Sequence, residues 1–452
     1  MIRLKKLKTF ILNSTILIIT SLILRVVALY FNSYVSSKIS TEAFGIFQLI
    51  LSVYAFGITL ASAGINLATT RIISEEMALN NISCIKKVAV KSILLSLFCG
   101  ILASFIILLN SNFILETCFH NKVNIVIIYM ICIALPFISM SSSITGFFNA
   151  IRKVYKSASS QFIEQFIKIC SIAFLFSLFM PLTIENACFA LILGDLISEI
   201  GAFLYLFILY SFDKNIYKIN AHCNSNENYT KKLLGISVPV ALTSYIRSGL
   251  STIKQLIIPS SLEKNGISCS IALSTYGIIS GMSMQIIMFP ILFISSFSTL
   301  LIPEFSRYYA KKDYKRICEV SKFVLILTSL FSVFSTIIIY AFSNKLSLII
   351  FQNSECAYYL KLLAPVIIFI YIDNVVDSIL KGINVQVRVM VINIIDLLFT
   401  VTIIYFLVPF LGIKGYVISI YISEIFNFSL SLGLLYLELK KHNKNKGASY
   451  LL

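Results

Sequence analysis

Two stretches of the chain repeat one another: Phe148–Lys168 reads FNAIRKVYKSASSQFIEQFIK, and Lys381–Thr400 reads KGINVQVRVMVINIIDLLFT. In each stretch a short turn with basic residues leaves one apolar segment and enters the next. A shift of 232 residues aligns the two without a gap and places Lys156 on Arg388. Internal repeats of this kind are typical of duplicated membrane folds. We therefore predict two copies of one membrane unit.

The composition excludes a water-soluble globule. Of 452 residues, 58% are hydrophobic and 13% are charged, and the mean hydropathy is +0.91, whereas soluble domains are about 25% charged. We predict an all-α integral membrane protein with about twelve transmembrane helices in two pseudo-symmetric six-helix lobes, and the run at 271–300 is long enough to be tilted or broken near Pro290. The apolar segments lie at 10–31, 43–69, 88–109, 123–147, 158–180, 186–210, 233–257, 271–300, 319–341, 359–380, 389–408 and 413–437.

The predicted lobes span 1–212 and 233–440, with a polar cytoplasmic linker at 213–232 and a cytoplasmic tail at 441–452. The longest outer connection, about 342–358, is too short to form a catalytic domain. We therefore expect no enzyme activity and no cofactor, and we expect the protein to act inside the bilayer, as a monomer among membrane lipids.

The distribution of basic residues predicts the orientation. One alternate set of connections, with both termini, holds 25 Lys and Arg residues, and the other set holds only Lys38, Lys122, Lys264, Lys345 and Lys414. Cytoplasmic loops collect Lys and Arg, so we expect both termini to be cytoplasmic in a multi-pass protein of the cell membrane. This asymmetry also explains the net charge of +17 without a nucleic-acid partner. The ten cysteines have no metal-ligand spacing, and we interpret them as small buried hydrophobic residues with no metal site.

The cations within the predicted membrane helices include Arg25, Arg247 and Lys254. An ionisable side chain at mid-membrane costs about 2.5–3.5 kcal/mol on insertion scales, so each needs a partner or a water-filled cavity. One interpretation is that each pairs with a carboxylate to hold the helices together. The other is a basic cavity for an anionic substrate, with Arg25 and Arg247 as the main candidates and Lys254 also able to extend outward.

The acidic residues of the membrane helices are candidate charge partners or ion-coupling groups. Glu164 and Lys168 form an i,i+4 pair that neutralises itself in the simplest interpretation. Two like-charge pairs have the same spacing, Asp195 with Glu199 and Asp373 with Asp377. Their role is open: they take up a proton or a cation, or they pair with the arginines. The candidates are Glu164, Asp195, Glu199, Asp373, Asp377 and Asp396.

The run 256–310 resembles the stage V sporulation protein B group of polysaccharide-transport proteins. The residues that carry the likeness are Pro259, Leu262, Gly266, Tyr276-Gly277, Gly281-Met282, Phe289-Pro290, Leu301-Ile302-Pro303-Glu304 and Ser306, with Gly146-Phe147-Phe148, Ser160-Gln161 and Glu164-Gln165 at the repeated turn.

This resemblance implies the multidrug/oligosaccharidyl-lipid/polysaccharide (MOP) exporter superfamily, with a MATE-like pair of lobes that alternate access to the two sides of the membrane. The implied activity is flipping of polyprenyl-diphosphate-linked sugars for cell-wall, spore-cortex or capsule assembly. In related lipid II flippases, cavity arginines are thought to hold the diphosphate, which implies such a role for Arg25 and Arg247. Many members carry fourteen helices, and this chain departs from them with twelve predicted.

Two alternatives stay open. A cation-coupled drug or metabolite antiporter of the same superfamily predicts that Asp373 or Glu199 matters more than Arg25. A membrane-embedded sugar polymerase predicts catalytic carboxylates or histidines in sizeable loops, whereas His120, His222 and His442 lie in separate connections and in the tail without partner spacing.

The charge asymmetry generates a topological prediction. Single cysteines introduced near Lys214 and Lys312 in a cysteine-free background are expected to react with a membrane-impermeant maleimide only after the membrane is opened. Cysteines near Lys264 and Lys345 are expected to react in intact cells. The reverse labelling pattern would overturn the predicted orientation.

Overall fold

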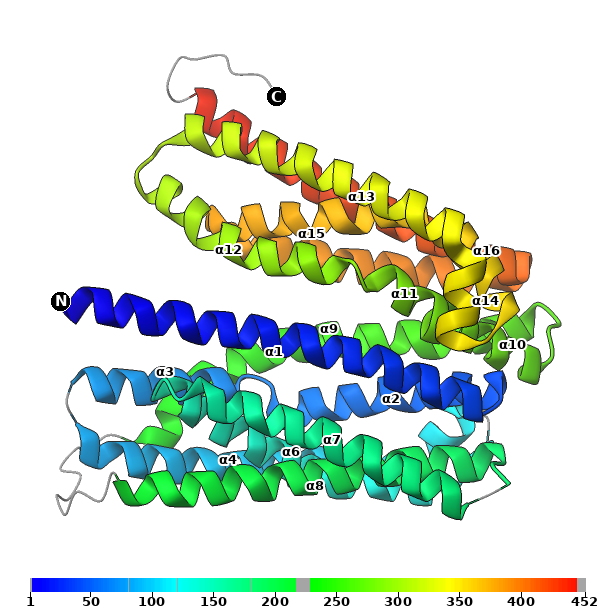
Figure 1. Cartoon of the computed structure of the whole chain (residues 1–452), viewed down its shortest axis with the longest axis horizontal. Coiled ribbons are helices and arrows are strands. Elements are labelled where there is room, and N and C mark those ends of the chain that lie inside the picture. Colours follow the sequence, from blue (N-terminus) through cyan, green and yellow to red (C-terminus); the bar gives the residue numbers. More distant parts are fainter. Residues whose placement is uncertain (1, 80, 120, 180, 217–227, 445–452) are drawn as a thin grey trace. The chain divides into compact units, whose positions relative to one another are not determined.

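The structure is a computed structural model that describes residues 2–79, 81–119, 121–179, 181–216 and 228–444, with side chains not described at 2–18, 82–83, 214–216, 299 and 441–444. Within this part of the chain every regular element is a helix (Figure 1). Contacts divide the protein into two compact units, Met1–Asn32 with Lys38–Thr252, and Ser33–Ser37 with Ile253–Leu452.

The first unit is built on close helix pairs, chiefly α4 with α6, α7 with α8, and α6 with both α8 and α3 (Figure 1). Helices predominate because a backbone in hydrocarbon must satisfy its own hydrogen bonds. The elements are α1 (Ile2–Lys38), α2 (Thr41–Ser62), α3 (Ile65–Ala78), α4 (Ile82–Leu109), α5 (Ser111–Phe113), the π-helical turn Ile114–Cys118, α6 (Val126–Ala150), α7 (Val154–Leu178), α8 (Ile184–Ile216) and α9 (Tyr229–Lys264), which continues into the second unit.

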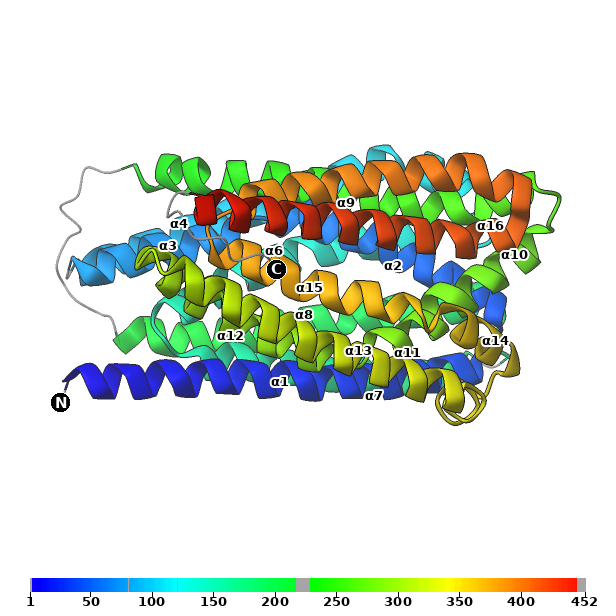
Figure 2. The same cartoon turned by 90° about the horizontal axis from the view of Figure 1, so that it is seen from above.

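The second unit pairs α15 with α16, α12 with α15, and α13 with both α14 and α15. Its last helix, α16 (Gln386–Lys444), is kinked at Gly412, where φ is 58° and ψ is −134°. The two arms, orange and red, run back beside each other in Figure 2. The other elements are α10 (Cys269–Tyr276), the π-helical segment Gly277–Ser283, α11 (Met284–Met288), α12 (Ile291–Ala310), α13 (Tyr314–Phe351), α14 (Ser354–Leu363) and α15 (Val366–Gly382).

The described residues supply twelve candidate membrane spans when the two arms of α16 are counted separately. Ten helices are long and apolar enough to cross a bilayer, and the bent pair α14 and α15 adds one. One of the ten includes both arms of α16, which has 59 residues and is about 88 Å long at 1.5 Å per residue, nearly three times the hydrocarbon core. Because α16 is kinked at Gly412, it accounts for two spans, and the predicted count is confirmed.

Breaks and ends of the helices test the predicted segments. The predicted break near Pro290 is confirmed, because α11 ends at Met288 and α12 begins at Ile291. The outer connection predicted at 342–358 is wrong: α13 continues to Phe351. The polar residues that prompted the prediction include serines that are small enough to pack inside the bundle, and Ser343 and Ser347 are fully buried.

The domain boundaries stay a prediction. The division by contacts falls after Thr252, inside α9, rather than in the predicted linker. Of that linker, residues 217–227 lie outside the described part of the chain, as do residues 445–452 of the predicted tail.

The repeated turn has the same backbone in both copies, which confirms the 232-residue register. α6 ends at Ala150 and α15 ends at Gly382. Two residues later, Arg152 and Asn384 have φ of 61° and 66°. In each copy the next N–H returns to a carbonyl five residues back at 3.0 Å, from Lys153 in the first and from Val385 in the second.

A glycine contact brings two helices together in each unit. A Cβ at Gly146 of α6 would lie 2.8 Å from the carbonyl oxygen of Asn66, and one at Gly382 of α15 would lie 2.5 Å from Cβ of Phe305. Facing hydroxyls donate to the same glycine carbonyls at 3.0 Å, from Thr70 to Gly146 and from Ser306 to Gly382. Small residues that permit such close approach are characteristic of helix packing in membranes.

Alanine at either glycine is expected to destabilise its unit. Overpacking typically costs about 1–3 kcal/mol, so Gly146→Ala and Gly382→Ala should each lower the melting temperature of the detergent-purified protein. Gly235→Ala and Gly433→Ala are matched controls because no atom lies within 4 Å of a Cβ at these sites, and they should leave it unchanged or slightly higher. Equal melting temperatures for all four variants would contradict the close-approach interpretation.

Candidate functional site

The two predicted arginines lie on the first unit with exposed side chains. Arg25 is on α1 and Arg247 is on α9. Among the residues that the structure describes, no carboxylate forms an ion pair with either guanidinium. The structural interpretation, in which each arginine pairs with a carboxylate of the bundle, therefore has no support in these contacts.

Arg247 lines an open cavity of about 460 Å³ between α2 and α9. Its other polar lining consists of hydroxyls, and the lining does not include Arg25. Thr59 and Ser62 come from α2, and Ser244, Ser248 and Ser251 come from α9. We call this cavity the Arg247 groove. Ser244, Arg247, Ser248 and Ser251 recur at spacings of three and four residues, which places them on one face of a helix.

Hydrogen bonds fix α9 against α2 on both sides of the Arg247 groove. The Tyr245 hydroxyl donates to the carbonyl of Leu60 at 3.0 Å, and the Thr252 hydroxyl donates to the carbonyl of Ser52 at 3.1 Å. Between them an added Cβ at Gly249 would lie 3.4 Å from the ring of Phe56 of α2, an ordinary van der Waals distance. The groove walls are therefore held in place before any ligand arrives.

The interior of the first unit contains a cluster of charges between α7 and α8. Lys168 Nζ lies 2.7 Å from Asp195 Oδ1, and the Asp195 side chain is only 5% exposed. The predicted self-neutralising pair of Glu164 and Lys168 is thus not the closest one, because Asp195 approaches Lys168 from the neighbouring helix. Glu164 and Glu199 also interact electrostatically with Lys168. Three carboxylates therefore share one ammonium group.

Tyr54 of α2 adds an unpartnered hydroxyl to this first-unit cluster. Its side chain is buried, its hydroxyl has no hydrogen-bond partner among the described residues, and it interacts electrostatically with Glu199, Asp195 and Glu164. A buried hydroxyl without a partner is unusual in a native protein. Its position beside carboxylates provides a donor that a change in charge of the cluster can recruit.

The second unit contains a comparable cluster around Lys254. Lys254 of α9 interacts electrostatically with Asp396 and with Glu424, both on α16. Two carboxylates of its own unit thus compensate its charge, which favours a structural role for Lys254 over substrate binding. Sequence reasoning missed Glu424, and the signal available was its position inside the last apolar segment.

Asp373 and Asp377 of α15 complete the second cluster. Asn427 donates to Asp373 at 2.9 Å, and Lys381 pairs with Asp377 at 3.3 Å. Asp373 also interacts electrostatically with Asp377, so the two carboxylates of this predicted like-charge pair lie close enough to affect one another. Within the described residues, no three His, Cys, Asp or Glu side chains are grouped so that they could hold a metal ion.

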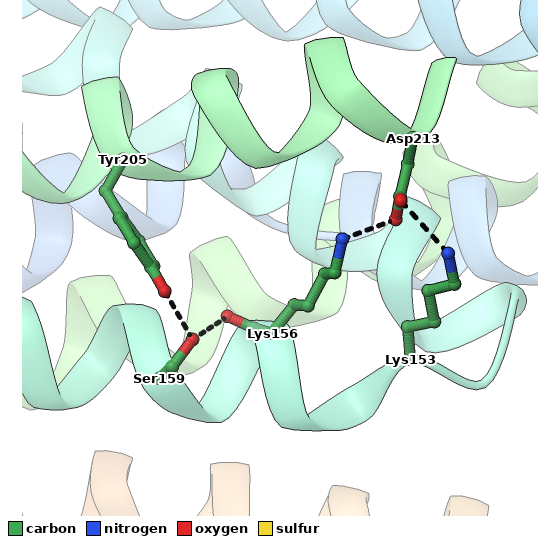
Figure 3. A network of polar contacts seen from close by, with 5 residues as sticks. All are labelled: Lys153, Lys156, Ser159, Tyr205 and Asp213. Carbon is green, nitrogen blue, oxygen red and sulfur yellow. Dashed lines mark hydrogen bonds and ion pairs between the residues drawn. The ribbon is translucent and has the colours of Figure 1, made fainter. Parts of the chain in front are cut away.

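The repeated turn carries an ion-paired clasp in each unit. In Figure 3, Asp213 near the end of α8 lies between Lys153, which precedes α7, and Lys156 of α7, with Nζ to carboxylate oxygen distances of 3.0 and 2.8 Å. In the second unit Arg388, the repeat mate of Lys156, pairs with Glu438 near the end of α16. The first ion pair joins α7 to α8, and the second joins the two arms of α16, which are the corresponding helices of the second repeat. Both pairs therefore hold neighbouring helices together and have a scaffold role.

Comparison with known proteins fits this architecture. The model of the "Polysaccharide biosynthesis protein" family matches residues 10–309, and the MatE model matches residues 266–406. Stage V sporulation protein B of Bacillus subtilis is 24% identical over 91% of this chain and 81% of its own length. Sporulation protein YkvU of the same organism is 21% identical over 75% of this chain and 74% of its own length.

A solved structure gives the fold independently. The inward-facing conformation of a multidrug resistance MATE family transporter of the MOP superfamily superposes with a TM-score of 0.73 at 14% identity, over 93% of this chain and 95% of that one. Because the family model matches most of the chain, the protein belongs to the polysaccharide biosynthesis protein family, and its fold is that of a MATE transporter.

Proposed function

We propose that the protein is a flippase or exporter that moves a polyprenyl-diphosphate-linked oligosaccharide across the cytoplasmic membrane by alternating access. Its product would serve assembly of the cell wall, spore cortex or capsule, in line with the sporulation proteins among its relatives. The proposal includes a monomer in the cell membrane with both termini in the cytoplasm. The observation that carries it is Arg247, a cation that no described carboxylate neutralises, in a groove lined by hydroxyls.

Arginine suits a diphosphate for a physical reason. The guanidinium stays protonated and presents forked donors that match phosphate oxygens, whereas lysine keeps the charge but loses the fork. Arg25 provides a second exposed cation on the first unit. Its role in the same substrate path is part of the proposal, although the Arg247 groove does not include it.

Removal of either arginine is expected to impair transport without impairing folding. A hydrogen bond to a charged group contributes about 1.5–3 kcal/mol, so Arg25→Ala and Arg247→Ala should each slow transport by roughly 10- to 100-fold, and Arg→Lys should keep partial activity. Transport of a polyprenyl-diphosphate sugar in proteoliposomes and the melting temperature should be measured on the same preparations. Arg307→Ala is the matched control, since Arg307 is exposed and pairs with its neighbour Glu304.

The melting temperature separates the two interpretations of the arginines. Breaking a buried ion pair typically costs about 3–5 kcal/mol, so a structural role predicts loss of folded yield together with activity. Full transport by the Arg25→Ala, Arg247→Ala double variant would refute the diphosphate site.

A second candidate function, a cation-coupled drug or metabolite antiporter, is favoured by the two interior clusters. The first cluster has three carboxylates for one lysine, and the unpartnered Tyr54 hydroxyl lies beside it. An excess of carboxylates in low dielectric favours uptake of a proton or a cation. The same groups would equally supply ion coupling to a flippase, so the transported substrate distinguishes the two functions.

Ion coupling is tested by Glu199→Gln and Asp373→Asn. Each substitution is isosteric and removes one charge, and we expect it to lower transport driven by an imposed pH or sodium gradient by about tenfold or more, the scale of one lost charge interaction. Transport without a gradient should change little. Glu319→Gln, an exposed residue that faces Lys315, is the control. Unchanged gradient dependence in both variants would assign the clusters a structural role.

A further inference from the structure

We infer that the Arg247 groove holds the junction between the phosphate and the first sugar of the substrate, with Arg247 and its neighbours on α9 binding the anion and the hydroxyls of α2 and of Ser244 accepting hydrogen bonds from the sugar. This inference rests on the proposed function, because it assumes a phosphate-linked sugar as the substrate. It goes further in assigning recognition of the sugar to three named hydroxyls, Thr59, Ser62 and Ser244.

These three hydroxyls present acceptors to the groove. Each donates its proton to the carbonyl four residues earlier in its own helix: Thr59 to Ala55 at 2.8 Å, Ser62 to Ile58 at 2.7 Å and Ser244 to Val240 at 2.9 Å. A hydroxyl has one proton and two lone pairs. Because the helix carbonyl takes the proton of each hydroxyl, only the lone pairs of the hydroxyl oxygen face the groove. These positions therefore favour ligand groups that carry N–H or O–H donors.

The remaining polar groups are donors. Arg247 carries only donors, and within the described part of the chain Ser248 and Ser251 have no hydrogen-bond partner that would hold their protons. All three lie on α9, whereas both polar groups of the α2 wall are committed acceptors. The groove thus has donors on α9 for an anionic group, and acceptors for a polyol on α2 and at Ser244.

The size of the groove limits what it holds. A cavity of about 460 Å³ falls in the lower part of the range of roughly 300–1,000 Å³ for small-molecule sites. This volume fits a diphosphate and one sugar ring rather than a whole oligosaccharide. The groove is also held in shape by the bonds from Tyr245 and Thr252, which reduces the ordering that binding requires.

An organic cation is a poor match for the same groove. The acceptor hydroxyls alone would suit an ammonium group, but Arg247 would repel it with no described carboxylate nearby to offset its charge. The donors and acceptors together therefore favour an anion with an attached polyol over a cationic drug.

The test compares two probes on the purified full chain in lipid nanodiscs. One probe is a polyprenyl diphosphate that carries a single N-acetylhexosamine, and the other is the same polyprenyl diphosphate without sugar. The wild type is expected to bind the sugar-bearing probe more tightly. Thr59→Val, Ser62→Ala and Ser244→Ala should each weaken binding of that probe by roughly 3- to 10-fold, the scale of one hydrogen bond, and leave the affinity for the sugarless probe unchanged.

The controls separate sugar recognition from helix geometry. Thr402→Val and Ser429→Ala remove exposed hydroxyls of α16 that also donate to the carbonyl four residues earlier, and both should leave the two affinities at wild-type values. Arg247→Ala should weaken the binding of both probes by the same factor. This equal loss would identify Arg247 as the phosphate-binding group.

Three outcomes would overturn the inference. Equal affinity of the wild type for both probes would refute sugar recognition while leaving the proposed function standing. Equal weakening of both probes by the hydroxyl variants would assign these hydroxyls to the shape of the helices. No binding of either probe by the wild type would overturn the proposed function and the inference with it.

Discussion

The cost of an uncompensated charge in hydrocarbon governs how the two units are built. An ionisable group at the bilayer centre costs about 2.5–3.5 kcal/mol on insertion scales, and each unit meets this cost with its own residues. One lysine lies among carboxylates in each, Lys168 in the first and Lys254 in the second. Glu164 and Asp396, which belong to these two clusters, are repeat mates. Arg25 and Arg247 differ from these lysines, because among the described residues no carboxylate forms an ion pair with either guanidinium.

Much of the fold was predictable because insertion into a bilayer leaves few solutions. The repeated turn, the twelve spans and the break near Pro290 follow from apolar length, proline and the 232-residue register, and the structure confirms all three. The failure at 342–358 has the same origin. A hydropathy pattern with polar residues predicts a loop, yet Ser343 and Ser347 are small enough to be buried between packed helices.

The candidate site was less predictable, because its parts are defined by contacts between helices. A lone arginine in an apolar segment identifies Arg247, but serines and threonines are common in membrane helices and gave no signal by themselves. The ion pairs between helices were equally hard to predict from the sequence. Spacing alone joins Lys168 to Glu164 on one helix, whereas Asp195 approaches it from the next. Glu424 and Tyr54 lack any local pattern and become visible only once the helices are packed.

The repeat also separates scaffold from site. The turn with a positive φ and the basic residue of the ion pair, Lys156 or Arg388, recur at equivalent positions of both units, so duplication preserved part of what holds a unit together. The groove hydroxyls behave in the opposite way. At the positions 232 residues from Thr59, Ser62, Ser244, Ser248 and Ser251 the sequence has Ile291, Ile294, Leu12, Ile16 and Ile19. Only one copy carries these hydroxyls, so they do not serve a scaffold function that both copies need. Its hydroxyls are best explained by a ligand that meets the protein at one place.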